Sequence, residues 1–144
     1  MLDRNMYPEA IERSDRAAEP GAVYVAPRAS YGELHCHSNY SFQEGASDTQ
    51  ELLKRAQELG YRALAITDHD NLCGTMEFAQ AARDAGIKAI IGVEVTLKGD
   101  HHLTLLSETS EGYKNISRLI THAHIDAEER NNPELAPALL AEHT

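Results

Sequence analysis

The stretch LGYRALAIT, residues 59–67, has a counterpart in AGIKAIIGV, residues 85–93, which begins 26 positions later. In both stretches a glycine is followed by an apolar residue, a basic residue and an alanine, and then by a nearly continuous apolar run. Short apolar runs of this kind are typical of strands that are buried on both faces of a sheet. The pair therefore predicts an α/β fold with two parallel strands covered by helices, in either an open doubly wound sheet or a (β/α) barrel.

A helix is expected before each of these two strands. Ser47 or Asp48 can cap the first helix, because Asp48 and Glu51 have the spacing of a capping box. Gly60 is placed to end this helix. Thr75 is expected to cap the second helix, which ends at the glycine before the second strand.

The remaining patterns predict further elements on both sides of this unit. Residues 1–30 mix prolines, glycine and charges without a sustained period, and we expect a flexible extension there, ahead of a domain that spans residues 31–144. The predicted elements are a first strand at 32–36, two strands within 95–106 joined by a turn at 98–101, a helix at 110–125, and a last helix from about Pro133.

The bulk composition excludes some classes of protein. The formal net charge of −10 argues against a domain that grips nucleic acid through a basic face. No apolar run approaches the roughly 20 residues that a membrane span needs, and no secretory signal is visible. The two cysteines are too few for a disulfide framework, so we expect a reducing, cytoplasmic setting and no membrane partner.

Potential metal ligands follow three consecutive predicted strands. The first strand ends in His35 and His37, the second in residues 67–70, TDHD, and the third in Glu94. Sites in parallel α/β folds form at the carboxyl ends of the strands, so we expect these side chains to converge. Sets of imidazole and carboxylate groups suit divalent metals. The pattern therefore predicts a metal site.

Each of these residues also has a plainer interpretation. His35 and His37 share one face of a strand and could be ordinary surface residues. The TDHD segment could be a solvated turn that caps a helix, and Glu44 could be a solvated turn residue. Glu94 is harder to explain in this way, because a carboxylate at the end of a buried strand needs a partner. The histidines of the predicted helix 110–125 are expected to face solvent.

Four segments carry a resemblance to a known family. They are ELHCHSNYSFQEGAS (33–47), ALAITDHDNLCG (63–74), KAIIGVEVTL (88–97) and HLTLLSETSEGYKNISRLI (102–120). Their sequence and order resemble the PHP (polymerase and histidinol phosphatase) domains. The likeness is greatest to the N-terminal PHP domains of bacterial DNA polymerase III alpha-type subunits, particularly of the error-prone branch.

The resemblance implies a fold and an activity. The expected fold is the N-terminal part of a distorted seven-stranded (β/α) barrel of the TIM-like type. The implied activity is metal-dependent phosphoester hydrolysis, with 3′–5′ exonuclease proofreading in polymerases. The implied cofactor is a cluster of up to three divalent ions, zinc, manganese or iron. The implied partners are the other polymerase domains or subunits and, through them, DNA.

The resemblance also assigns roles to residues. Asp68 and Asp70 are expected to orient the histidines rather than bind metal. His35, His37, His69 and Glu94 are the expected catalytic residues. The expected metal ligands are His35, His37, Glu44, His69, Glu94 and His102.

One departure from the family pattern shapes the expectations. The family completes its metal cluster with a later histidine and an Asp-x-His pair, which this chain does not contain. We therefore expect an incomplete barrel and an incomplete metal cluster, and a chain that self-associates. The alternatives are a non-catalytic structural or docking module of a polymerase, and a stand-alone phosphatase of the histidinol phosphatase type.

Overall fold

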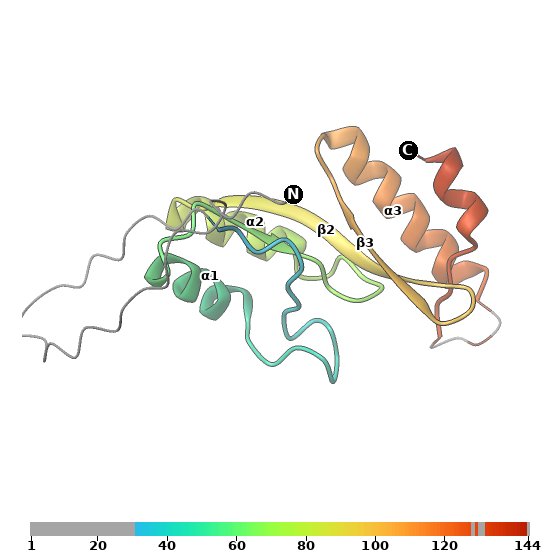
Figure 1. Ribbon diagram of the computed structural model, residues 1–144, viewed down its shortest axis with the longest axis horizontal. Coiled ribbons are helices and arrows are strands. Elements are labelled where there is room, and N and C mark those ends of the chain that lie inside the picture. The colour runs from blue at the N-terminus through green and yellow to red at the C-terminus, as the bar shows by residue number, and fades with distance from the viewer. Residues whose placement is uncertain (1–30, 128, 130–131, 144) are drawn as a thin grey trace, which may run out of the picture.

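The computed structural model describes residues 31–127, 129 and 132–143, so the predicted flexible extension at 1–30 lies outside the described residues. A three-stranded sheet has the order β1-β2-β3, with β1 parallel and β3 antiparallel to the central strand (Figure 1). No described helix has the length and apolarity that a membrane crossing requires. The elements are α1 (Thr49–Glu58), β1 (Ala63–Ile66), α2 (Thr75–Ala85), β2 (Lys88–Leu97), β3 (His101–Leu106), α3 (Ser110–Ile125) and the 3₁₀ helix η1 (Pro137–Glu142).

The helix boundaries follow largely from local signals. Asp48 caps α1, and its carboxylate and that of Glu51 form the expected reciprocal capping box. Gly60 follows α1 with a positive φ of 73°, a conformation that favours glycine. The expectation that Thr75 caps α2 is wrong, because Thr75 is the first helical residue and Gly74 holds the cap position. A side chain at position 74 would collide with the ring of Tyr40, since a Cβ atom there would lie 2.7 Å from it.

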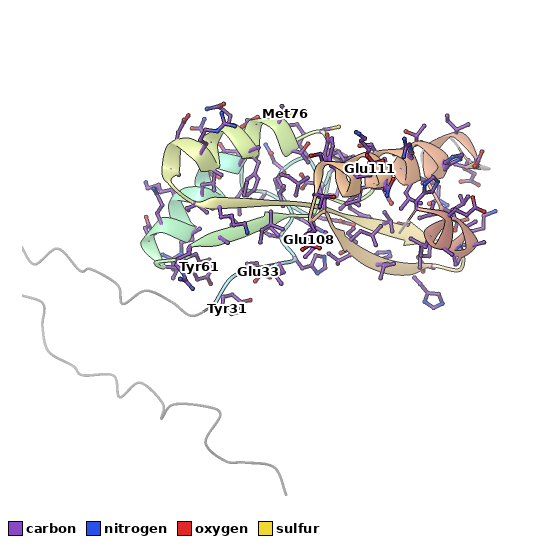
Figure 2. All side chains as sticks on the ribbon, turned by 90° about the horizontal axis from the view of Figure 1, so that it is seen from above. Tyr31, Glu33, Tyr61, Met76, Glu108 and Glu111 are labelled. Carbon is purple, nitrogen blue, oxygen red and sulfur yellow. The ribbon has the colours of Figure 1, made fainter. Side chains whose placement is uncertain are left out.

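Three predicted elements differ in the structure. The strand expected to end at Glu94 and the strand expected from residue 95 form one continuous strand, β2. Residues 32–36 make only one isolated bridge, between Glu33 and Leu64, rather than a strand. The Glu33 carboxylate, labelled in Figure 2, accepts hydrogen bonds from the backbone N–H groups of Leu34 and His35. These two donors are therefore not available for a regular strand ladder, although the Glu33 carbonyl still accepts the N–H of Ala65. The last helix begins at Pro137 rather than near Pro133, because the backbone of Leu135 first pairs with β2.

The hydrophobic core has two parts, and β2 runs through both of them (Figure 1). One part packs α1 and α2 against β1, and includes the fully buried Phe78 and Ile66. The other packs α3 and the C-terminal segment against the second half of β2, and includes Val93 and Val95. The 10-residue β2 therefore connects the two parts, and the residues at its centre are held from both sides.

We predict that the chain self-associates through the outer edge of β3. Among the described residues this edge has no strand partner, so its backbone groups are open to pairing, and Leu106 at its end is 41% exposed. Sedimentation velocity over a range of concentrations should show dimers or larger species. Leu106→Lys should shift the chain toward monomer, whereas Met76→Lys on the exposed face of α2 should not. A monodisperse wild-type monomer with one cooperative melting transition would contradict the prediction.

Candidate metal centre

Backbone pairing beyond the end of β1 brings the predicted ligands together. His69 forms a parallel bridge with Glu94 of β2. The Glu94 N–H donates to the Asp68 carbonyl at 3.2 Å, and the Asp70 N–H donates to the Glu94 carbonyl at 2.8 Å. The segment that follows β1 is thus fixed against the middle of β2. The expected convergence is present, but it joins the carboxyl end of β1 to the middle of β2, because β2 continues past Glu94 to Leu97.

A first group of potential ligands consists of His35, His37 and Glu94, whose ligand atoms lie within 4.8 Å of one another. Nε2 of His35 contacts Oε2 of Glu94, and Nε2 of His37 lies 3.4 Å from the same oxygen. The His37 Nε2 atom is buried and has no hydrogen-bond partner among the described residues. An unpaired buried nitrogen that faces a carboxylate suits a metal ion.

A second group consists of His69, Glu94 and His102, which meet the same distance limit of 4.8 Å. Nδ1 of His102 lies 2.8 Å from Oε1 of Glu94, and the rings of His69 and His102 are 4.7 Å apart. Glu94 is therefore common to both groups, with one carboxylate oxygen toward each. A carboxylate in this position can bridge two cations.

Glu44 contacts one histidine of each group: His37 of the first and His69 of the second. Its carboxylate oxygens lie 2.8 and 2.9 Å from Nδ1 of His69, and Oε2 lies 3.4 Å from Nδ1 of His37. Glu44 comes from the turn after the first histidine pair rather than from a strand. Glu44 is an exposed turn residue, as its plainer interpretation expects, but it also contacts two of the predicted ligands.

The electrostatics favour an ionised Glu94. Burial alone would raise the pKa of Glu94, but the hydrogen bond and charge of His35, with the hydrogen bond of His102, hold the pKa below its ordinary value. Cys36 lies on the other side of the chain from its histidine neighbours and packs against the core, where burial raises the pKa of its thiol. Cys36 is therefore not a candidate nucleophile.

A hydroxyl group orients the ring of His69. Thr96 donates its hydroxyl proton to Oδ2 of Asp70 at 2.7 Å, because a carboxylate can only accept. The Thr96 oxygen, 2.8 Å from Nε2 of His69, must then accept the proton of that nitrogen. In a neutral ring, Nδ1 would point its lone pair at the carboxylate of Glu44. A cation between Nδ1 and this carboxylate would remove the repulsion, so the donor set fits a metal ion.

Asp68 is a buried residue that positions the segments carrying the ligands. It is only 2% exposed and accepts hydrogen bonds from the N–H and hydroxyl of Ser38 and from the hydroxyl of Ser41, at 2.6 to 3.0 Å. The Ser41 hydroxyl oxygen in turn accepts the N–H of His69 at 2.9 Å. Asp68 thus ties the loop that carries His37 and Glu44 to the segment that carries His69.

Sequence reasoning missed four residues of this arrangement. Ser38, Ser41 and Thr96 are buried hydroxyl residues that position the ligands, but serine and threonine are common in exposed loops and so give no signal of their own. His124 was expected to face solvent; it is exposed, yet a ring nitrogen lies 2.8 Å from the Asp70 carbonyl. Only the folding of α3 back over the sheet brings it there.

Substitution of Asp68 should destabilise the whole site. Asp68→Ala leaves three buried donors of Ser38 and Ser41 without an acceptor, and should lower the free energy of unfolding by more than about 2 kcal/mol. Asp68→Asn retains one acceptor oxygen and should lie between Asp68→Ala and the wild type. Urea unfolding in the presence of a chelator measures the loss without a contribution from metal. The exposed Asp84 of α2 provides the control Asp84→Ala, and equal effects of the two alanine substitutions would contradict the assigned role.

Comparisons with known proteins identify the family of the chain. A family model described as the PHP domain matches residues 33–144. The chain is 46% identical over 114 residues to the error-prone DNA polymerase of Symbiobacterium thermophilum, a match that covers 79% of this chain and 10% of the relative. It is 48% identical over 107 residues to the error-prone DNA polymerase of Pseudomonas aeruginosa, a match that covers 74% of this chain and 10% of the relative.

A solved structure extends the likeness to the fold. A proposed metal-dependent phosphoesterase from Bifidobacterium adolescentis matches with a TM-score of 0.52 and 25% identity, over 69% of this chain and 35% of that one. The chain spans about a tenth of the length of the curated relatives. Its homology to part of the error-prone DNA polymerases and the family match over most of its length lead to one conclusion: the chain belongs to the PHP domain family.

Proposed function

We propose that this chain is a metal-dependent phosphoesterase domain that hydrolyses phosphodiesters. The observation that supports it best is the position of Glu94, which the two three-residue groups share. A carboxylate common to two ligand groups suits adjacent cations, and paired cations are a frequent device for cleaving phosphoesters. The homology to polymerases favours DNA as the substrate class.

In this proposal the ligands are His35, His37, Glu44, His69, Glu94 and His102, and the metals are divalent zinc, manganese or iron. When bound, such cations activate water near neutral pH and neutralise charge on phosphoryl oxygens. The chain's own residues fix the geometry: Thr96 keeps a proton on Nε2 of His69 and leaves Nδ1 for a ligand role. The side chain of His35 is 53% exposed, so the first ligand group is open to solvent at this residue.

We also propose a place for the domain in a larger protein. Residues 31–144 would form the N-terminal part of a barrel of the PHP type, in a polymerase of the error-prone kind. The remaining polymerase domains or subunits would then be its partners, and DNA would reach it through them. The activity in that setting would be 3′–5′ exonuclease proofreading.

Two other functions remain alternatives with different expected behaviour. A structural or docking module of a polymerase would bind metal but hydrolyse nothing. A small-molecule phosphatase would prefer phosphomonoesters such as histidinol phosphate to phosphodiesters. Hydrolysis assays with phosphodiester and phosphomonoester substrates separate the three functions.

Binding of metal by both ligand groups should depend on the shared carboxylate of Glu94. Glu94→Gln keeps the shape but removes the charge that both groups use, and should abolish retention of every ion rather than of one. Metal content after dialysis, measured by mass spectrometry with zinc, manganese and iron offered separately, gives the result. Glu108→Gln, an exposed position, should retain the wild-type content. Wild-type content in Glu94→Gln would remove the basis for the metal centre.

Hydrolysis should depend on metal and on the ligand set. The full chain with manganese should cleave bis(p-nitrophenyl) phosphate and shorten single-stranded DNA from its 3′ end, and both activities should fall to the background rate with a chelator. The double variant His35→Ala with His37→Ala should be inactive. Metal binding without any hydrolysis would instead support the structural module, and hydrolysis of histidinol phosphate alone would support the small-molecule phosphatase.

A further inference from the structure

An open hollow of about 410 Å³ adjoins the candidate metal centre. Its volume falls within the range of roughly 300–1,000 Å³ that is usual for ligand pockets. One side carries His69 and His102, and the loop that bears Glu44 contributes two aromatic rings, Tyr40 and Phe42. Any strand end that places a phosphodiester at the metal centre would also have its terminal nucleotide near this hollow.

Phe42 is exposed to an unusual degree for its type. At 86% exposure it is the most exposed large hydrophobic side chain among the described residues. Exposure of a phenyl ring to water is unfavourable, and a single such residue on a surface is common. The position of Phe42 is less common, since it lines a hollow beside a cluster of potential metal ligands.

The turn that presents Phe42 is rigid. The N–H groups of Glu44 and Gly45 donate to the Ser41 carbonyl at 3.0 and 2.9 Å, and Gln43 has a positive φ of 70°. Gly45 packs so closely that a Cβ atom there would lie 1.9 Å from the carbonyl oxygen of Ser38. Because Ser41 is itself buried and bonded to Asp68, the backbone that carries Phe42 is fixed, which lowers the entropic cost of ordering its exposed ring on a ligand.

Tyr40 is held in place beside it. Its ring packs over Gly74, where an added Cβ would lie 2.7 Å away, and its hydroxyl donates to Glu77 at 3.0 Å. Tyr40 remains 40% exposed and also lines the hollow. Two aromatic side chains from one fixed loop thus face the same space, one of them restrained by α2.

The charge of the hollow favours stacking over ion pairing as a means of holding a nucleotide. None of its described lining residues is lysine or arginine, and the acidic ones are Glu44, Asp70 and Asp100. The acidic side chains repel a phosphate away from the metal centre, and the neutral donors there include Asn71, His124 and Asn132. Stacking of a base on an aromatic ring does not depend on charge and tolerates any base.

We propose that Phe42 stacks against the base of the unpaired terminal nucleotide of a DNA strand whose last phosphodiester lies at the metal centre. This proposal rests on the proposed phosphodiesterase function. It adds that Phe42 makes the site prefer strands whose terminal nucleotide carries a base. Tyr40 supports the same nucleotide from the restrained side of the loop.

The test compares two single-stranded oligonucleotides that differ only at the 3′ end. One ends in 2-aminopurine, whose fluorescence falls when it stacks, and the other in an abasic tetrahydrofuran residue; both carry a phosphorothioate at the last linkage to slow cleavage. The full chain, with and without manganese, should bind the base-ended strand roughly 5- to 150-fold more tightly and quench its fluorescence. Competition by the abasic strand gives its affinity.

Four variants separate stacking from other roles of Phe42. Phe42→Ala and Phe42→Leu should lose the preference for the base, and Phe42→Tyr should keep it. Met76→Ala, at an exposed position on the outer side of α2, should behave as wild type (Figure 2). Because Phe42 is exposed, none of its variants should alter the thermal unfolding of the chain.

The outcomes divide clearly. Equal binding of the two strands by the wild type, binding of neither, or a preference that survives Phe42→Ala would overturn the stacking role. A change of oligomeric state in Phe42→Ala without any base preference in the wild type would assign Phe42 to a protein interface instead. If the base preference is present but no phosphodiester is cleaved, the stacking role stands and the proposed hydrolysis fails. If phosphodiesters are cleaved without the base preference, the hydrolysis stands and the stacking role fails.

Discussion

The geometry of the site depends on one buried carboxylate, that of Glu94, held at the middle of the central strand. Burial disfavours a lone negative charge, so the fold must supply partners for both oxygens, and it does so with histidines from separate segments. His35 and His37 approach from the loop before α1, and His102 approaches from β3. The requirement to neutralise the Glu94 carboxylate therefore brings the loop before α1 and strand β3 into contact with the middle of β2.

Hydroxyl and carboxylate groups that contact the ligands fix the positions of the ligand side chains. Asp68 fixes the loop, and Asp70 works through Thr96 to set which nitrogen of His69 carries the proton. Neither aspartate belongs to the two ligand groups, so both act through other residues. Because these contacts are buried or half-buried, the ligands are positioned by the protein itself before any ion arrives.

The sequence predicted the parts of this structure that repeat a strong periodic signal. The apolar runs at 63–66 and 88–93 and the glycines after α1 and α2 correctly indicated the parallel pair and its helices. Residues 32–36 have the same apolar and polar alternation as a strand, but the side chain of Glu33 competes for the backbone donors, which the pattern does not encode. The polar residues after the apolar runs correctly indicated that His69 and Glu94 meet, although Glu94 lies inside β2 rather than at its end. The hydroxyls of Ser38, Ser41 and Thr96 could not be found in this way, because only tertiary packing distinguishes a buried hydroxyl from an exposed one.

The passage of β2 through both halves of the core has a thermodynamic consequence. The candidate ligands come from both halves: His35 and His37 belong to the side of α1, whereas His102 lies on the β3 hairpin. Cations held by the two ligand groups, which share Glu94, would act as a reversible cross-link between two packing units that otherwise share one strand. The folding of each unit would then be linked to the concentration of free metal, and the chain would melt as one cooperative body with the ion and as two without it.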